Sequence, residues 1–151
     1  MNYSIKEMSK MTGLAPSALR YYDKQGLLPT LKRDENNVRI FSDDDVRGLR
    51  VISCLKRSGL SIKDIKKFID AVEQGDEALD KRLEIFTNRR EILKQELEEL
   101  QEISDMIEYK CWYYETACAA GTEDVMKNLK PSDVPEKFRK ARERLLGQCS
   151  S

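Results

Sequence analysis

The chain has 151 residues, of which 36% are charged and 40% hydrophobic, and its formal net charge is zero. A chain of this length holds one or two small domains, and this composition favours long solvated helices over a large globular core. The sequence contains no histidine, which removes the commonest general base and every histidine-containing metal site. Without a phosphate-binding loop or a nucleophile–base pair, it does not predict an enzyme, a cofactor or a bound metal.

The charge is unevenly distributed along the chain. Residues 1–70 contain 14 Lys and Arg against 9 Asp and Glu, and residues 71–151 contain 13 against 18. The first half, with an excess of five positive charges, is therefore the half expected to contact phosphates. The chain has no run of 18 apolar residues and no apolar N-terminal segment, so we expect a cytoplasmic protein that does not enter the membrane.

The first two predicted helices are short and are joined by a tight turn. Ser4 caps a helix that ends near Met11, with Glu7 completing a capping box. Thr12-Gly13-Leu14 forms the turn, Pro16 suits the first position of the second helix, and Gly26 stops it. Two short helices joined by a glycine-containing turn predict a helix-turn-helix, whose second helix reads a DNA groove.

A small hairpin and two further helices are predicted next. Asn36-Asn37, between two short basic and apolar runs, indicates a hairpin too small for a core, which is typical of a wing. Ser42 with Asp45 predicts a helix over residues 43–58, and Ser61 with Asp64 predicts a helix over residues 62–74. Glycines at 59 and 75 end these two helices.

A single long helix is predicted from about residue 77 to residue 120, where the sequence has neither proline nor glycine. Residues in heptad steps form a mostly apolar seam flanked by charges, which indicates a coiled coil. At 1.5 Å per residue the helix is about 60 Å long and cannot bury its stripe alone, so a partner chain is implied. The seam consists of Leu79, Leu83, Phe86, Arg90, Leu93, Leu97, Leu100, Ser104, Ile107, Cys111, Tyr114 and Cys118.

The predicted fold is therefore mainly α-helical. A winged helix-turn-helix DNA-binding domain covers residues 1–75, a coiled-coil dimerisation helix covers residues 76–120, and a C-terminal tail covers residues 121–151. The tail contains Pro135 and a basic stretch over 137–144, and is expected to be either a short helix or disordered.

Four sequence blocks follow one another in the N-terminal half of the chain. They are Tyr3-Ser4-Ile5; Leu19-Arg20-Tyr21-Tyr22-Asp23 with Gly26-Leu27-Leu28-Pro29; Arg33-Asp34-Glu35-Asn36-Asn37-Val38-Arg39-Ile40-Phe41; and Gly59-Leu60-Ser61-Ile62-Lys63-Asp64-Ile65. In this order the blocks resemble the MerR family of bacterial transcription regulators. Cys54-Leu55-Lys56 and the segment over 109–114 further resemble its aldehyde- and nitric-oxide-responsive branch, named for a Neisseria MerR-like member.

The resemblance implies a homodimer held by an antiparallel pair of long helices. It implies binding to a pseudo-palindromic promoter with an over-long spacer, which the regulator distorts so that RNA polymerase can engage both recognition elements. Two other classes remain open. One is an effector-independent architectural DNA-bending protein of the excisionase kind, and the other is a coiled-coil interaction protein with no role on DNA.

The residues expected to bind DNA lie on the second helix, the wing and the fourth helix. Ser17, Arg20, Tyr21 and Tyr22 offer groups that bond base edges or phosphates, although either tyrosine could instead pack into the core. Arg33 and Arg39 flank the hairpin turn and suit phosphates or the minor groove, or simply keep the wing soluble. Lys63 lies near a helix N-terminus, where free amides and a cation favour phosphate.

Cys54 is the candidate sensor thiol. On the third helix it falls away from the apolar stripe and has Arg47, Arg50 and Arg57 as helical neighbours. Cations beside a thiol favour the thiolate and raise its reactivity toward electrophiles and oxidants. The alternative is a small residue at the edge of the core, with the arginines facing DNA.

The remaining cysteines do not predict a metal site. None of the four cysteines has the spacing of a small disulfide-stapled domain, and we expect reduced thiols. Cys111 and Cys118, two turns apart on one helix, are separated by about 10 Å and cannot share a metal, so both are expected to be seam residues. Cys149 is expected to be a mobile thiol. Trp112-Tyr113-Tyr114 is expected to pack onto the partner's DNA-binding domain, or else to line a ligand pocket.

Overall fold

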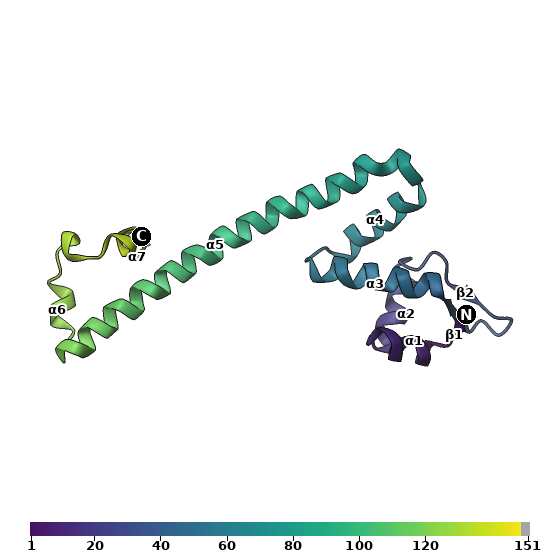
Figure 1. Ribbon diagram of the computed structural model, residues 1–151, viewed down its shortest axis with the longest axis horizontal. Coiled ribbons are helices and arrows are strands. Elements are labelled where there is room, and N and C mark those ends of the chain that lie inside the picture. Colours follow the sequence, from purple (N-terminus) through teal and green to yellow (C-terminus); the bar gives the residue numbers. More distant parts are fainter. Residues whose placement is uncertain (149–151) are drawn as a thin grey trace. The chain divides into compact units, whose positions relative to one another are not determined.

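The computed structural model describes residues 1–148 and divides the chain into two compact units, Met1–Arg90 and Glu91–Ser151 (Figure 1). The boundary lies inside the long helix rather than at residue 75, where the sequence suggested it. The reason is that the first turns of this helix pack on the N-terminal unit. Ile85 lies against the N-terminal core, and the ring of Phe86 meets that of Phe68 edge-on with 5.4 Å between centroids.

The helix-turn-helix is formed by α1 (Ile5–Thr12) and α2 (Pro16–Lys24). The predicted capping box at the start of α1 is confirmed, since Ser4 and Glu7 each accept from the other's backbone N–H. Gly13 ends α1 in the left-handed conformation, with a φ of 71°. Pro16 starts α2, as expected from its missing N–H. These local signals fix the two helices and the sharp turn between them.

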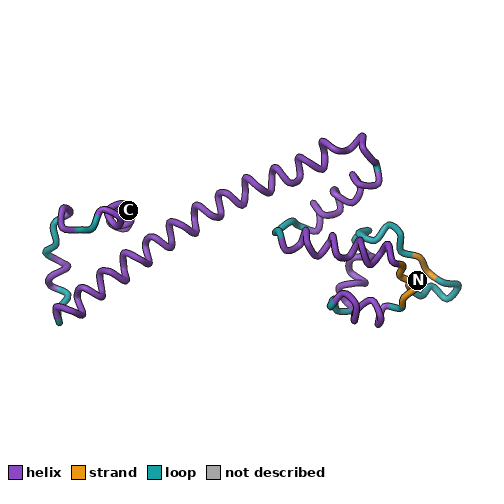
Figure 2. Tube along the Cα trace, in the orientation of Figure 1, coloured by secondary structure: helices purple, strands orange, loops and turns teal. Residues whose placement is uncertain are grey.

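A three-stranded antiparallel sheet carries the wing. Its strands, drawn in orange in Figure 2, are β1 (Asn2–Tyr3), β2 (Lys32–Arg33) and β3 (Arg39–Ser42). They lie in the order β1-β3-β2. The predicted hairpin is therefore present, and Asn37 at its tip adopts a φ of 61°. The Asp34 carboxylate holds the turn by accepting from the backbone N–H groups of Asn36 and Val38. The edge strand β1 was not predicted, because two residues are too few to show an alternating pattern.

Two capped helices complete the core of the N-terminal unit. α3 (Asp43–Arg57) and α4 (Ile62–Glu73) are capped at their N-termini by Ser42 and Ser61, as predicted. Their apolar faces meet those of α1 and α2 in one cluster, and burial of this apolar surface is the main stabilising contribution. Its largest fully buried side chains include Met8, Leu19, Leu27, Phe41, Leu49, Ile52 and Ile65.

The long helix α5 (Leu79–Ala120) follows a short 3-10 turn, η1 (Gly75–Ala78), and has 42 residues. It is continuous over nearly the whole predicted range. The apolar residues of the predicted seam are exposed by 42% to 65% in the single chain. No helix within residues 1–148 is long and apolar enough to cross a membrane.

The tail folds back onto the end of α5 instead of being disordered. It contains α6 (Asp124–Lys127), the 3-10 turn η2 (Pro131–Asp133) and α7 (Glu136–Gln148). Phe138 of α7 lies 5.5 Å from the Trp112 ring and 6.3 Å from the Tyr109 ring, measured between centroids. Val134 and Ala141 complete a second small core around these rings. Aromatic rings account for most of this core, which explains why a short, highly charged helix is ordered here.

Candidate nucleic-acid interface

One face of α2 is exposed and polar. Ser17, Arg20, Tyr21 and Lys24 are all exposed, and they recur at the spacing that places residues on one helical face. Leu19 and Tyr22 are buried on the other side. The exposed face therefore presents a hydroxyl, a phenol and two cations together, which are the groups that proteins use on phosphates and base edges. Lys24 was not predicted as a DNA-binding residue, although its position seven residues after Ser17 indicates the same helical face.

Tyr22 corrects one expectation. Its side chain is 8% exposed and belongs to the N-terminal core, whereas that of Tyr21 is 47% exposed. The two rings are consecutive, and each residue turns an α-helix by 100°, so one points inward when the other points outward. A nearly covered ring has little surface to offer DNA. Tyr22 is therefore a packing residue, and the prediction that it contacts DNA is not kept.

The wing is tied to the recognition helix through one carboxylate. Asp23, near the end of α2, accepts from Arg33 Nη2 at 2.5 Å and from Arg39 Nε at 2.7 Å, both on its Oδ2 atom. Arg33 also donates to the Asn37 carbonyl. The Arg39 and Asp23 side chains are only 23% and 18% exposed. The two arginines predicted to meet phosphates thus hold the hairpin against α2, and Arg33 is the more exposed of the two.

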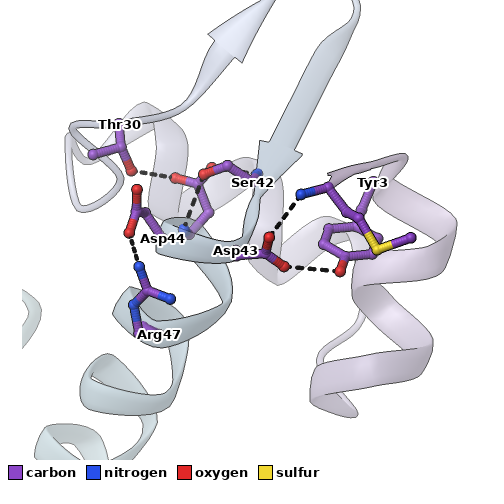
Figure 3. A network of polar contacts seen from close by, with 8 residues as sticks. Tyr3, Thr30, Ser42, Asp43, Asp44 and Arg47 are labelled. Carbon is purple, nitrogen blue, oxygen red and sulfur yellow. Dashed lines mark hydrogen bonds and ion pairs between the residues drawn. The ribbon is translucent and has the colours of Figure 1, made fainter.

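The start of α3 is fixed by polar contacts (Figure 3). Asp45 is 1% exposed, and its carboxylate accepts from the Thr30 hydroxyl at 2.6 Å and from the Ser42 N–H at 2.7 Å. The adjacent Asp43 accepts from the N-terminal ammonium and from the Tyr3 hydroxyl. These two donors lower the pKa of the Asp43 carboxyl, and the Asp43 hydrogen bond raises the pKa of Tyr3. This network joins β1, β3 and α3 at the base of the wing.

Lys63 is exposed on the first turn of α4, as predicted. The turn is capped by Ser61, whose hydroxyl donates to Asp64 at 2.9 Å. This hydrogen bond lowers the pKa of the Asp64 carboxyl. A second cation, Lys67 on the following turn, pairs with Asp64 at 3.2 Å. The start of α4 can therefore present Lys63 to a phosphate, and that role stays a prediction.

Cys54 is exposed on α3, while Val46, Leu49, Ile52 and Leu55 are buried, so the predicted orientation of this thiol is confirmed. Arg50 and Arg57 are exposed within one turn of it, on the same side of the helix. Arg47, two turns away, forms an ion pair with Asp44 (Figure 3). The positive surroundings of the thiol therefore come mainly from the two nearer arginines.

The other cysteines of the described chain lie on the long helix. Cys111 and Cys118 are exposed on α5, and Cys149 lies outside the described residues. Within residues 1–148, no three side chains of cysteine or acidic residues are placed to hold a metal ion. Trp112 and Tyr113 pack with the Phe138 cluster of their own chain. The tail thus gives Trp112 and Tyr113 a cover that the sequence did not predict. Packing of the aromatic segment on a partner chain stays a prediction.

The sequence of this chain matches the models of two protein families. The model described as MerR HTH family regulatory protein matches residues 3–72, and the model described as MerR, DNA binding, matches residues 46–109. An uncharacterised helix-turn-helix transcriptional regulator of Haemophilus influenzae is 37% identical over 136 residues, which cover 90% of this chain and 98% of the relative. The regulator AdhR of Bacillus subtilis is 30% identical over 90 residues, covering 60% of this chain and 64% of AdhR.

Two crystal structures are similar in both sequence and fold. HiNmlR, a MerR family regulator lacking the sensor domain and bound to promoter DNA, is 38% identical with a TM-score of 0.62, covering 83% of this chain and 99% of HiNmlR. A putative MerR family regulator of Listeria monocytogenes is 30% identical with a TM-score of 0.66, covering 83% of this chain and 95% of that chain. Similarity to HiNmlR agrees with the Neisseria MerR-like branch. The chain belongs to the MerR family of helix-turn-helix transcription regulators.

Proposed function

We propose that this regulator binds promoter DNA as a homodimer, distorts an over-long spacer for RNA polymerase, and responds to electrophile or redox stress through Cys54. The observation that carries the DNA-binding part is the exposed face of α2, with Ser17, Arg20 and Tyr21 beside a wing anchored to the same helix through Asp23. HiNmlR, a relative of similar length, was crystallised on promoter DNA. A regulator that works with RNA polymerase on promoters acts in the cytoplasm.

The seam of α5 supports a homodimer. Leu93, Leu97 and Leu100 are exposed by 43%, 59% and 61% in the single chain. Water contact along this stripe is costly, because each fully buried leucine contributes about 1.5–3 kcal/mol relative to an exposed one. A second α5 helix would cover the stripe at heptad spacing.

The position of α7 leaves this seam accessible. α7 packs on Tyr109 and Trp112, and its Arg144 pairs with Glu102 at 2.8 Å. Glu102 and Tyr109 each lie two residues beyond a seam position, which places them about 200° around the helix from it. These are outer positions of a coiled coil. The tail of each chain would thus cover the back of α5 while the partner covers the front.

The charge of α5 favours an antiparallel pair. Residues 79–94 contain five Lys and Arg against three Asp and Glu, whereas residues 95–120 contain one against seven. Antiparallel pairing sets the positive half of each helix beside the negative half of the other, while parallel pairing sets like charges together. Two recognition helices would then lie at opposite ends of the dimer, as a pseudo-palindromic operator requires.

The DNA-binding part is tested by Arg20→Ala in the full chain, with Glu35→Ala in the exposed wing turn as the control. A bidentate contact to a base contributes about 1–3 kcal/mol, so operator affinity should fall about 10- to 100-fold at fixed salt in a fluorescence-anisotropy titration. Binding to random duplex should fall far less. Full operator affinity in Arg20→Ala would remove this residue from the interface.

The stress response is tested at Cys54, with Cys149, which lies outside the proposed seam, as the control. Iodoacetamide should label Cys54 faster than Cys149 if its arginine neighbours activate it. In run-off transcription with an aldehyde, a nitrosating agent or a peroxide, Cys54→Ser should bind the operator but lose the response. Cys111→Ser and Cys118→Ser should retain it. If the wild-type protein bends DNA but none of these reagents changes transcription, the protein would instead be an effector-independent architectural DNA-bending protein.

A further inference from the structure

A hydrogen bond joins the end of α3 to the third turn of α5. Arg89 Nε donates to the Ser58 carbonyl oxygen at 2.7 Å. Ser58 is the C-terminal cap of α3, where the last carbonyl groups of a helix lack intrahelical donors and carry partial negative charge. A guanidinium is well suited to this position, because it is planar and always charged. The contact links residues 31 positions apart in the sequence.

Gly59 makes room for this guanidinium. It has a φ of 84°, and a Cβ placed there would lie 2.8 Å from Arg89 Cζ and 2.9 Å from Arg89 Nε. A side chain at residue 59 would therefore displace the arginine. Among the glycines of the described chain, no other has a neighbouring side chain closer than 3.0 Å to its would-be Cβ. The glycine thus serves both the left-handed helix end and the close approach of Arg89.

The contact lies close to the end of the part of α5 that belongs to the N-terminal unit. Ile85 packs on the core, and Phe86 meets Phe68 one turn before Arg89. The N-terminal unit ends at Arg90. The 31 residues of α5 beyond Arg89 extend about 46 Å at 1.5 Å per residue. We call the contact between Arg89 and Ser58 the joint. A small rotation of α5 at this joint would produce a large displacement at the far end of the helix.

We infer that Arg89 is a positioning residue, which sets the angle between the DNA-binding unit and α5 and thereby the operator spacing that the dimer prefers. This inference rests on the proposed dimeric regulator. Two rigid units related by the α5 pair can place their recognition helices at only one separation for each joint angle. A loosened joint would let each half bind its half-site while the dimer loses its fixed distortion of the spacer, and that distortion carries an energy cost.

The test uses Arg89→Met, which keeps an apolar stem, and Gly59→Ala, which displaces the guanidinium from the other side. Gln95→Ala is the control, since Gln95 is exposed just beyond Arg89 and lies on the side of α5 opposite the seam. Full-length proteins are assayed on promoters whose spacers vary by single base pairs, with run-off transcription as one readout. Affinity for a duplex carrying one half-site is the second readout, which loss of folding would reduce.

Both variants are expected to bind the half-site duplex within about threefold of the wild type. Their activation at the wild-type optimum should fall at least tenfold, and the optimum should broaden or move by a base pair. Gln95→Ala should behave as the wild type. The inference is overturned if Arg89→Met keeps the activation level and spacer optimum of the wild type, or if its half-site affinity falls as much as its activation.

The wild-type protein separates this failure from that of the proposed function. If the wild type neither binds nor activates a promoter at any spacing, the regulatory proposal fails first. If the wild type activates at one spacing and Arg89→Met does so equally, the inference about Arg89 fails while the proposed function stands.

Discussion

The two compact units of this chain bury their apolar residues in different ways. In the unit Met1–Arg90, four short helices and a three-stranded sheet direct their apolar side chains into one shared core. In the unit Glu91–Ser151, a single helix receives a cover from α7 on one side, while Leu93, Leu97 and Leu100 stay exposed on another. A set of short amphipathic helices can satisfy its own apolar faces, whereas a long straight helix can satisfy only the part that its own chain folds back to reach.

This difference is consistent with a regulator in which one unit binds DNA and the other contacts a partner chain. The first unit presents a preorganised surface to DNA, because both the recognition helix and the wing are fixed by contacts within one chain. The second unit has an apolar stripe that is exposed in the single chain and that the proposed dimer would cover. Each of the four predictions below tests one side of this comparison.

The largest effect is expected from placing charge on the seam. Leu93→Lys with Leu97→Lys removes four leucines from a dimer interface, a loss on the order of 6 kcal/mol or more. We expect monomers at micromolar concentration in sedimentation equilibrium, and loss of tight operator binding with it. The charge-matched control is Asn88→Lys with Gln95→Lys, which lie opposite the seam and should stay dimeric. Dimers in the leucine variant would place the interface elsewhere.

The next largest effect is expected from loosening the packing of α7 on the side of α5 opposite the seam. Phe138→Ala empties a site where the side chain is buried against Tyr109 and Trp112, which costs about 3–5 kcal/mol for a large core residue. We expect α7 to detach, seen as faster amide hydrogen exchange over residues 131–148, while the dimer persists. Leu146→Ala, at an exposed position of the same helix, should change neither. If Phe138→Ala abolishes dimerisation, the tail is part of the interface and the two faces of α5 are not independent.

The helices and the turns between them could be predicted from the sequence because their causes are local. Ser4 with Glu7 and Ser42 with Asp45 are capping boxes within four residues, and both are present in the structure. The heptad spacing likewise predicted one long helix, and Asn36-Asn37 predicted the hairpin turn. These signals depend on neighbours in the chain, so no knowledge of tertiary packing is needed to interpret them.

The features that could not be predicted depend on residues far apart in the chain. Phe138 meets Trp112 across 26 positions, and Arg89 meets Ser58 across 31. The site residues show the same limit. Tyr21 and Tyr22 are chemically identical in sequence, and only the packing of α2 separates the exposed ring from the buried one. Charged residues such as Arg39 suggest DNA contact by type, while the fold gives them an intramolecular partner.

A smaller effect is expected from loosening the wing. Asp23→Asn leaves Arg33 and Arg39 without their shared counter-charge in a partly buried position. We expect the free energy of unfolding to fall by about 1 kcal/mol, between the values for exposed and buried pairs. A double-mutant cycle with Arg39→Met, followed by urea unfolding, should give a coupling energy of about 1 kcal/mol. A coupling energy indistinguishable from zero would mean that the wing is held by its strands alone.

The smallest effect is the response of the first unit to acid. The backbone N–H of Ser4 donates to Glu7 at 2.7 Å and lowers the pKa of that carboxyl, as the Ser61 hydroxyl does for Asp64. A carboxyl whose folded-state pKa is lowered contributes stability that is fully present above its unfolded pKa, which is about 4. The contribution is lost as pH falls through the lower folded-state value. The stability of the first unit against thermal unfolding should therefore begin to fall below about pH 5.

Glu7→Gln should reduce this pH dependence while changing the melting temperature at pH 3 less than at pH 7. The control is Glu35→Gln, an exposed glutamate of the wing turn that caps no helix. Both carboxyls are well exposed to solvent, so each change in melting temperature should be small and should shrink in added salt. An equal loss of stability in Glu7→Gln at both pH values would show that the capping box stabilises α1 through its neutral hydrogen bonds, with the lowered pKa of Glu7 making no contribution to the acid response.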